Sequence, residues 1–290
     1  MADILVVIVT YNAEKWVKKC LKSLEKSSLP VDAVVIDNGS TDGTLALVRS
    51  GYPSTRVIET GQNLGFGAAN NIGLRIALDE GYKFAYLLNQ DAWLERDTLK
   101  KLVAAHKPEW GVLSPMQLNA NGRRDKNFQR KCGKIVDAAT GGYHNDLMVV
   151  EVPFVMAAHW LVSRKAIETV GGFSPAFRQY GEDDNWIDRL HYHGLHCGVV
   201  PAASAVHDRG GRRLPRAKKM QLKCIATVVK LSNPARNWHW MRIREVLELV
   251  GMGLKNFSSV PFKFIPELRA RFPELKGFRD ASRKKGAFLK

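Results

Sequence analysis

The stretch "FAYLLNQDA", Phe84–Ala92, runs from apolar residues directly into polar ones. The apolar part, 84–88, is typical of a buried strand. In α/β sheets, ligands bind beyond the carboxyl ends of the strands, so the residues that follow such a strand matter most. Asp91 fits two interpretations here: a ligand for a hard divalent cation, or the N-cap of a helix that begins at Ala92.

Short apolar runs alternate with amphipathic segments on the N-terminal side of this stretch. The apolar runs predict strands, and the segments with a helical apolar period predict helices. In chain order they are strand 4–9, helix 14–26, strand 34–37, helix 44–50, strand 56–59 and helix 67–80. This repeated pattern predicts an α/β fold, a Rossmann-like, mostly parallel sheet with helices on both faces. No GxGxxG fingerprint or Gly-Lys-Ser/Thr phosphate loop follows a strand, which argues against dinucleotide binding and P-loop chemistry.

The regular pattern declines after Asp91. Residues 115–150 are rich in Asn, Gly, Arg and Lys, and we predict a long loop or an irregular β region near a substrate site. Farther on, residues 163–170 have a helical pattern and residues 197–200 a strand-like one. We expect substrate contacts from 115–150 and from the surroundings of His159 and Trp160.

The positive charge is concentrated at the C-terminal end. Residues 1–211 carry 24 Lys and Arg against 23 Asp and Glu, whereas residues 212–290 carry 20 against 5. We therefore predict a neutral folded domain, 1–211, and a basic, aromatic-containing helical extension, 212–290, which meets an anionic partner. Its aromatic residues are expected to be exposed; they include Trp238, Trp240, Phe257, Phe262, Phe264 and Phe288.

The cysteines and the hydropathy favour a cytoplasmic protein. Cys20, Cys132, Cys197 and Cys224 show no paired CxxC spacing, so neither a zinc site nor a disulfide framework is indicated. The N-terminal apolar run is too short for a signal peptide, and no window reaches the ~20 apolar residues of a membrane span. A peripheral position on the inner face of the cell membrane stays open.

Three further segments carry candidate functional side chains. In "VVIDNGSTDGT", 34–44, we favour ligand contact for Asp37 and a helix N-cap for Asp42. Glu182, Asp183 and Asp184 open a helix, where they either interact with its dipole or include a general base with a perturbed pKa. A lone histidine is usually structural, but His207 precedes a glycine-rich basic turn and could ligate a metal or contact a phosphate.

Taken in order, these motifs resemble the inverting family 2 glycosyltransferases, which have the nucleotide-sugar-binding GT-A fold. The resemblance covers roughly residues 4–210 and looks closest to the bacterial rhamnosyltransferase-like branch. It rests on "VTYN", "VVIDNGSTDGT", "NLGFGAANNIG", "LLNQDAWLE", "VGGF", "YGEDDNWIDRL" and the late His207.

The resemblance implies roles for individual residues. Asp91 matches the final acid of the family's Asp-x-Asp motif, and His207 the histidine that often completes the metal or diphosphate site, which implies Mg²⁺ or Mn²⁺. Asp183, beside Glu182, matches the catalytic base, and 171–173 matches the turn that leads to the acceptor pocket. The residues expected to bind the nucleotide sugar are Thr10, Tyr11, Asn12, Asp37, Asn38, Asn63, Gly65, Asn70, Asn89 and Gln90.

The sequence departs from the family pattern at two places. Asn89 replaces the first acid of Asp-x-Asp, which leaves fewer anionic oxygens for the metal. The Glu-Asp-x-Asp motif reads Glu182-Asp183-Asp184-Asn185, so its second acid has moved forward by one place and Asp184 is the alternative base.

The resemblance implies a single displacement that moves a sugar from dTDP-rhamnose or a UDP-sugar to a glycan or lipid-linked glycan in bacterial surface polysaccharide synthesis. The basic, aromatic extension would then suit an anionic membrane surface, with a packed helical extension as the alternative. Two other readings stay open. One is a nucleic-acid-binding protein that uses the basic tail, although no nucleic acid is expected because no such motif occurs. The other is an inactive GT-A-like protein, suggested by Asn89 and Asn185.

Overall fold

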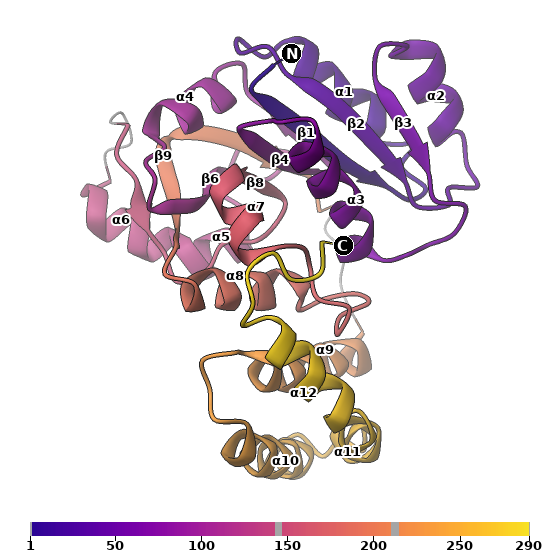
Figure 1. Ribbon diagram of the computed structural model, residues 1–290, viewed down its shortest axis with the longest axis vertical. Helices are drawn as coiled ribbons and strands as arrows, with labels where there is room; N and C mark the ends of the chain where they lie inside the picture. Colours follow the sequence, from indigo (N-terminus) through magenta and orange to yellow (C-terminus); the bar gives the residue numbers. More distant parts are fainter. Residues whose placement is uncertain (1, 143–146, 210–214, 290) are drawn as a thin grey trace.

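A central sheet organises the body of the protein in the computed structural model, which describes residues 2–142, 147–209 and 215–289 (Figure 1). Its order is β3-β2-β1-β4-β8-β6-β9-β5, and β7 also pairs with β9. Strands β1 to β4 are parallel to one another. Strand β8 runs antiparallel to both β4 and β6, so β6 points in the same direction as β4, and β9 is parallel to β6. The strands are β1 (Ile4–Thr10), β2 (Asp32–Asp37), β3 (Arg56–Glu59), β4 (Phe84–Asn89), β5 (Ala92–Leu94), β6 (Trp110–Leu118), β7 (Val150–Glu151), β8 (His159–Ser163) and β9 (His196–His207).

Helices cover both faces of this sheet, as the apolar strands predict. Alternate side chains of β1 enter opposite cores: Leu5 and Val7 join one, and Ile4, Val6 and Ile8 the other. The first face is covered by α3 (Phe66–Asp79), α7 (Arg164–Val170) and α8 (Glu182–Tyr192), and the second by α1 (Val17–Glu25), α2 (Thr44–Gly51) and α4 (Thr98–Ala105). The mostly parallel α/β sheet is therefore confirmed.

Strand register brings the polar strand ends together at one edge. Thr10 of β1 pairs with Asp37 of β2, and Val9 pairs with Asn89 of β4. Because these three strands are parallel, the residues that follow them emerge side by side.

Residues 126–140 are helical, so the prediction of a loop or irregular β region there was wrong. The segment comprises α5 (Lys126–Phe128), the π-helical turn η1 (Gln129–Gly133) and α6 (Lys134–Thr140). The Asp125 side chain caps it by accepting the N–H groups of Asn127 and Phe128. Phe128, Cys132 and Val136 recur every four residues and are buried in the core, so periodicity outweighed the polar composition. Residues 143–146 lie outside the described part.

Asp91 does not cap a helix, because the next element is the short strand β5. β5 pairs antiparallel with β9, and Ala92 lies opposite His207. The N-cap interpretation of Asp91 was therefore wrong.

Four helices form a C-terminal lobe with its own apolar core: α9 (Arg216–Ser232), α10 (Trp238–Lys255), α11 (Val260–Ala270) and α12 (Phe272–Ala281). Ala176 and Phe177, from the loop before α8, are part of that core. Trp238 is buried, so its predicted exposure was wrong, whereas Trp240 and Phe257 are exposed. The division at residue 211 falls among residues 210–214, outside the described part, and stays a prediction. No described helix is long and apolar enough to cross a membrane.

After α12 the chain returns to the body (Figure 1). The N–H of Gly172 donates to the Ala287 carbonyl at 2.8 Å, and the N–H of Gly286 donates to the Thr169 carbonyl at 3.1 Å. Gly171 has φ +82°, and a Cβ there would lie 1.9 Å from the Ala287 oxygen. The turn at 171–172 is thus held by the last described residues, which attach the lobe to the body at a second place.

Candidate functional site

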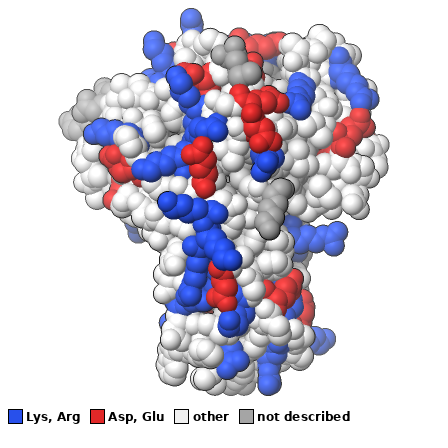
Figure 2. Space-filling model, viewed as in Figure 1, with Lys and Arg blue, Asp and Glu red and all other residues white. Residues whose placement is uncertain are grey.

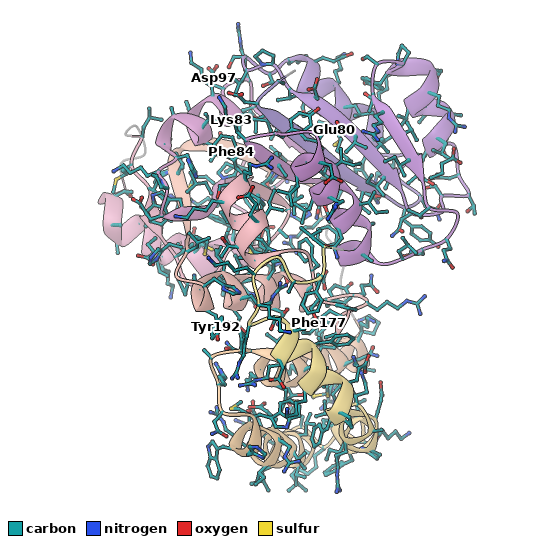
Figure 3. All side chains as sticks on the ribbon, in the orientation of Figure 1. Glu80, Lys83, Phe84, Asp97, Phe177 and Tyr192 are labelled. Atoms are coloured by element: carbon teal, nitrogen blue, oxygen red, sulfur yellow. The ribbon has the colours of Figure 1, made fainter. Side chains whose placement is uncertain are left out.

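A cleft of about 930 Å³ lies between the carboxyl edge of the sheet and the lobe. Figure 3 shows Phe177, one of its lining residues, at the junction of the two parts. The body side is lined by Val9, Tyr11, Asn12, Trp16, Asn38, Asn63, Gly65, Phe66, Asn89, Gln90 and Asp91. The loop 176–180 and the lobe residues Lys218, Gln221, Ile225, Val228, Phe264, Glu267 and Arg271 complete it.

Asp37 is the centre of a buried hydrogen-bond network at the end of β2. One carboxylate oxygen accepts the hydroxyls of Thr10, at 2.9 Å, and of Ser40, at 2.6 Å. The other accepts the N–H of Ser40 at 2.9 Å. Asp37 and Thr10 do not line the cleft themselves, and both are almost fully buried. The carboxylate therefore shapes the turn that carries the lining residue Asn38.

Gln90 and Asn12 hold the loop that follows β1. Gln90 accepts the N–H of Tyr11 at 2.7 Å and donates to the Tyr11 carbonyl at 3.3 Å. Asn12 has a left-handed backbone, φ 51°, and its side-chain oxygen accepts the N–H of Thr41 at 2.9 Å. These bonds hold the loop to the end of β4 and to the turn after β2. Both residues also line the cleft, so the loop presents them to a ligand there.

A second network joins Asn38 to the segment before α3. Its amide nitrogen donates to the Asn63 side chain at 3.1 Å, and its oxygen accepts the N–H of Leu64 at 2.9 Å. Gly65 then adopts φ +87°, and a Cβ there would lie 2.2 Å from the Arg178 carbonyl oxygen. Only glycine fits this close approach, which brings the loop before α8 against residues 63–65.

Asn70 is separated from these predicted site residues. It is buried in α3, its side chain donates to the Phe66 carbonyl at 2.9 Å, and it does not line the cleft. His159 and Trp160 are also fully buried. His159 bonds the Tyr86 hydroxyl through Nδ1 and the Val206 carbonyl through Nε2, and burial lowers its pKa to about 3. His159 and Trp160 therefore do not line the cleft themselves, and substrate contacts from the residues around them stay a prediction.

Asp91 and His207 meet across the β5–β9 pair. Nε2 of His207 lies 3.3 Å from Oδ1 of Asp91, and both side chains are mostly buried. Nδ1 of His207 and Oδ1 of Asn89 are buried polar atoms without a hydrogen-bond partner in the described part of the chain. Leaving such groups unsatisfied costs about 1–3 kcal/mol each, and a cation is one way to offset that cost.

The side chains of Asp91, His207 and Asn89 can hold a hard divalent cation only if a substrate supplies further ligands. Carboxylate and amide oxygens suit Mg²⁺ and Mn²⁺, whereas an imidazole nitrogen is taken more readily by a transition metal such as Mn²⁺ than by Mg²⁺. Within residues 2–142, 147–209 and 215–289, however, no group of three or more His, Cys, Asp or Glu gathers to hold a metal. Asp91, His207 and Asn89 would therefore supply part of the shell, with phosphate oxygens and water completing it.

The three acids that open α8 differ in their surroundings. Glu182 is buried against the start of α3, and burial, then the nearby Asp183, raises its pKa to about 8. Burial, then Asp184, raises the pKa of Asp183 to about 6. Asp184 lies 3.6 Å from the ammonium of Lys131, an ion pair to η1. The lining of the cleft reaches Tyr180 but does not include these acids.

Several site residues were missed by sequence reasoning. Ser40 stood inside the quoted "DNGSTDGT" motif, and its bonds to Asp37 could have been anticipated from the turn. Arg178, in the loop before α8, and Lys218 and Arg271, in the lobe, carry no motif, and for the last two only the docking of the lobe brings them to the cleft. The N-cap of α2 is Gly43, with no side-chain cap bond, so the prediction of Asp42 as the N-cap was wrong; its carboxylate instead accepts the N–H and the hydroxyl of Thr44, two residues on.

The chain is similar to characterised sugar transferases over most of its length. It is 29% identical over 245 residues to the N-acetylglucosaminyl-diphospho-decaprenol L-rhamnosyltransferase of Mycobacterium tuberculosis, covering 72% of this chain and 77% of the relative. It is 25% identical to a dTDP-rhamnosyl transferase of Shigella flexneri, covering 83% and 78%.

Solved structures show the same fold at lower identity. TarS of S. aureus with UDP-GlcNAc matches with a TM-score of 0.58 and 17% identity, covering 96% of this chain and 81% of that one. A Pyrobaculum calidifontis mannosyltransferase with GDP-Man and Mn²⁺ matches with a TM-score of 0.55 and 19% identity, covering 97% and 74%. These likenesses confirm the GT-A fold. The Glycosyl transferase family 2 model matches residues 5–171, more than half of the chain, and the protein belongs to that family.

Proposed function

We propose that this protein is an inverting glycosyltransferase that moves a sugar from dTDP-rhamnose or a UDP-sugar to a glycan or lipid-linked glycan in bacterial surface polysaccharide synthesis. The observation that carries the proposal is the set of braced polar strand ends, 10–12, 37–40, 63–65 and 89–91, which gather around one cleft. The rhamnosyltransferase names of two relatives support the choice of donor.

The donor nucleotide would lie along the body side of the cleft. Tyr11 offers an exposed ring, and Asn12, Asn38 and Asn63 offer amides whose positions are set by the networks behind them. Preorganised polar groups of this kind bind a ligand without first losing side-chain freedom.

Asp91, His207 and Asn89 would hold Mg²⁺ or Mn²⁺ together with the donor diphosphate. When bound, the ion would stabilise the negative charge that grows on the departing nucleotide diphosphate. Removing either Asp91 or His207 would weaken this site, because the described residues offer few other anionic ligands there.

Asp183 is the proposed general base. Its raised pKa makes it a stronger proton acceptor, while the ion pair with Lys131 occupies Asp184. Asp183 would take the proton of an acceptor hydroxyl as that oxygen bonds to the anomeric carbon. The bond from that carbon to the diphosphate oxygen breaks on the opposite face, so the configuration inverts.

A thermal-shift screen of nucleotide sugars, with and without Mn²⁺, tests the proposal. A ligand that binds only the folded state at 100 times its Kd stabilises it by about 2.7 kcal/mol, so dTDP-rhamnose or a UDP-sugar should raise the melting temperature. Asn38→Ala should abolish the shift, and Asn121→Ala, on an exposed turn far along the chain, should not. If no dTDP- or UDP-sugar shifts the wild-type protein, the proposal is wrong.

A further inference from the structure

A row of apolar side chains lies exposed along α10. Trp240, Ile243, Leu247 and Leu254 are between 54% and 65% exposed. Their spacing of three, four and seven residues returns to one side of the helix, so they form a stripe. Phe257, just beyond the helix, is 96% exposed and extends it. We call these five residues the α10 stripe.

The stripe is a second apolar face of a helix that already has one. Met241, Leu249 and Gly253 of α10 are buried toward the rest of the lobe. An amphipathic helix of a globular domain normally presents polar residues opposite its core face. A continuous apolar row on the outside instead marks an interaction surface.

Exposed cations lie on the same helix as this stripe and on its neighbour. Arg242, Arg244 and Lys255 are exposed on α10, and Lys263 is exposed on the neighbouring α11. Of the five acids in residues 212–290, four are in ion pairs within the lobe: Glu245 and Glu248 with Lys230, Glu274 with Arg271, and Asp280 with Lys276. Figure 2 shows Lys and Arg distributed over the C-terminal lobe, at the bottom of the view, with largely uncharged surface near the lower end of that lobe.

We propose that the α10 stripe docks on an anionic lipid bilayer. The apolar side chains would enter the boundary between headgroups and acyl chains, and the exposed cations would meet lipid phosphates. A second copy of the chain fits less well, because pairing two stripes would bring two lobes of like charge together. Nucleic acid would use the cations but leave the apolar row without a partner.

The position of α10 links this surface to the cleft. α10 packs on α9 and α11, and those helices supply Lys218, Ile225 and Phe264 to the cleft lining. Both α10 and the layer of α9 and α11 therefore lie between the docking surface and the cleft, about two helix diameters or roughly 20 Å. A lipid-linked acceptor held at the bilayer surface would be at about that distance from the cleft. This consequence rests on the proposed function, whereas the membrane contact itself does not.

Sedimentation with vesicles tests the docking surface. Full-length protein should sediment with phosphatidylcholine vesicles that contain phosphatidylglycerol, and much less with phosphatidylcholine alone. The variant Trp240→Gln, Leu247→Gln, Leu254→Gln should bind at least about 100-fold more weakly, because three apolar side chains no longer enter the interface. The matched control Ile135→Gln, Leu147→Gln, Met148→Gln changes exposed apolar residues of the body and should bind like wild type.

Three results would overturn the proposal: undiminished binding by the stripe variant, equal loss in the control, or no preference for phosphatidylglycerol. So would a wild-type dimer that the stripe variant converts to monomer without any vesicle binding, because the stripe would then be a contact between copies. Circular dichroism melting of both triple variants checks that they are folded. If vesicle binding behaves as expected while no nucleotide sugar shifts the melting temperature, the proposed transfer reaction fails and the docking surface stands.

Discussion

Nε2 of His207 lies 3.3 Å from Oδ1 of Asp91, although the two residues are 116 positions apart in the chain. The antiparallel pairing of β5 with β9 produces this contact by placing Ala92 opposite His207. Nδ1, the other ring nitrogen of His207, is buried and has no hydrogen-bond partner among the described residues. The pair therefore joins an acid to an available nitrogen ligand beside the cleft.

Asn89→Asp should strengthen metal binding at this pair. A second carboxylate adds a charged oxygen where the amide oxygen now lacks a partner, and we expect Mn²⁺ affinity to rise about tenfold. Without metal, repulsion from Asp91 should lower the melting temperature. Calorimetric titration with Mn²⁺, and melting with and without the ion, measure both effects. Asn121→Asp adds the same charge on an exposed turn, and a similar gain in that control would contradict the assignment.

Asp183→Asn should reduce the transfer rate by about 10²–10⁴-fold while donor binding persists, because an amide cannot accept the proton. In the wild type, the rate should rise with pH through about 6 as Asp183 loses its proton. Asp184→Asn should retain activity, and its rate should rise at a lower pH than that of the wild type. The reason is that the charge of Asp184, which raises the pKa of Asp183, is gone. The reverse result, with Asp184→Asn inactive and Asp183→Asn active, would make Asp184 the base.

Glu182→Gln should stabilise the fold, most clearly at alkaline pH. The pKa of Glu182 is raised from 4.5 to about 8, chiefly by burial. Between those values the folded protein holds a proton that the unfolded chain releases, so this group's contribution to stability falls as pH rises. The neutral amide removes that dependence, and we expect a gain of ~1–2 kcal/mol near pH 8. Denaturant unfolding at pH 5 and pH 8 measures it. Glu109→Gln, an exposed site, should change neither value.

Gly65→Ala should destabilise the protein by ~2–4 kcal/mol and abolish donor binding. The added Cβ would lie 2.2 Å from the Arg178 carbonyl and would push apart the segments before α3 and α8. Gly81 makes a matched control: its φ of +81° is similar, but a Cβ there meets nothing within 4 Å. Gly81→Ala should therefore lower the free energy of unfolding by only ~1–2 kcal/mol, which is the cost of an alanine with a left-handed backbone. Equal losses in urea unfolding would show that backbone strain, and not the contact with Arg178, explains the effect.

Much of this protein follows from the sequence by itself. Period-two and helical patterns are local, so they located the first strands and helices to within a few residues, and strand ends such as Asp37 and Asp91 then had to meet at one edge of a parallel sheet. In 126–140 the apolar period of Phe128, Cys132 and Val136 was present in the sequence, but the polar composition obscured it. Local signals failed for His159, because its burial depends on contacts with distant Tyr86 and Val206. Only the tertiary structure brought Lys218 and Arg271 to the cleft and left the α10 stripe uncovered, because docking of the lobe joins residues with no sequence pattern in common.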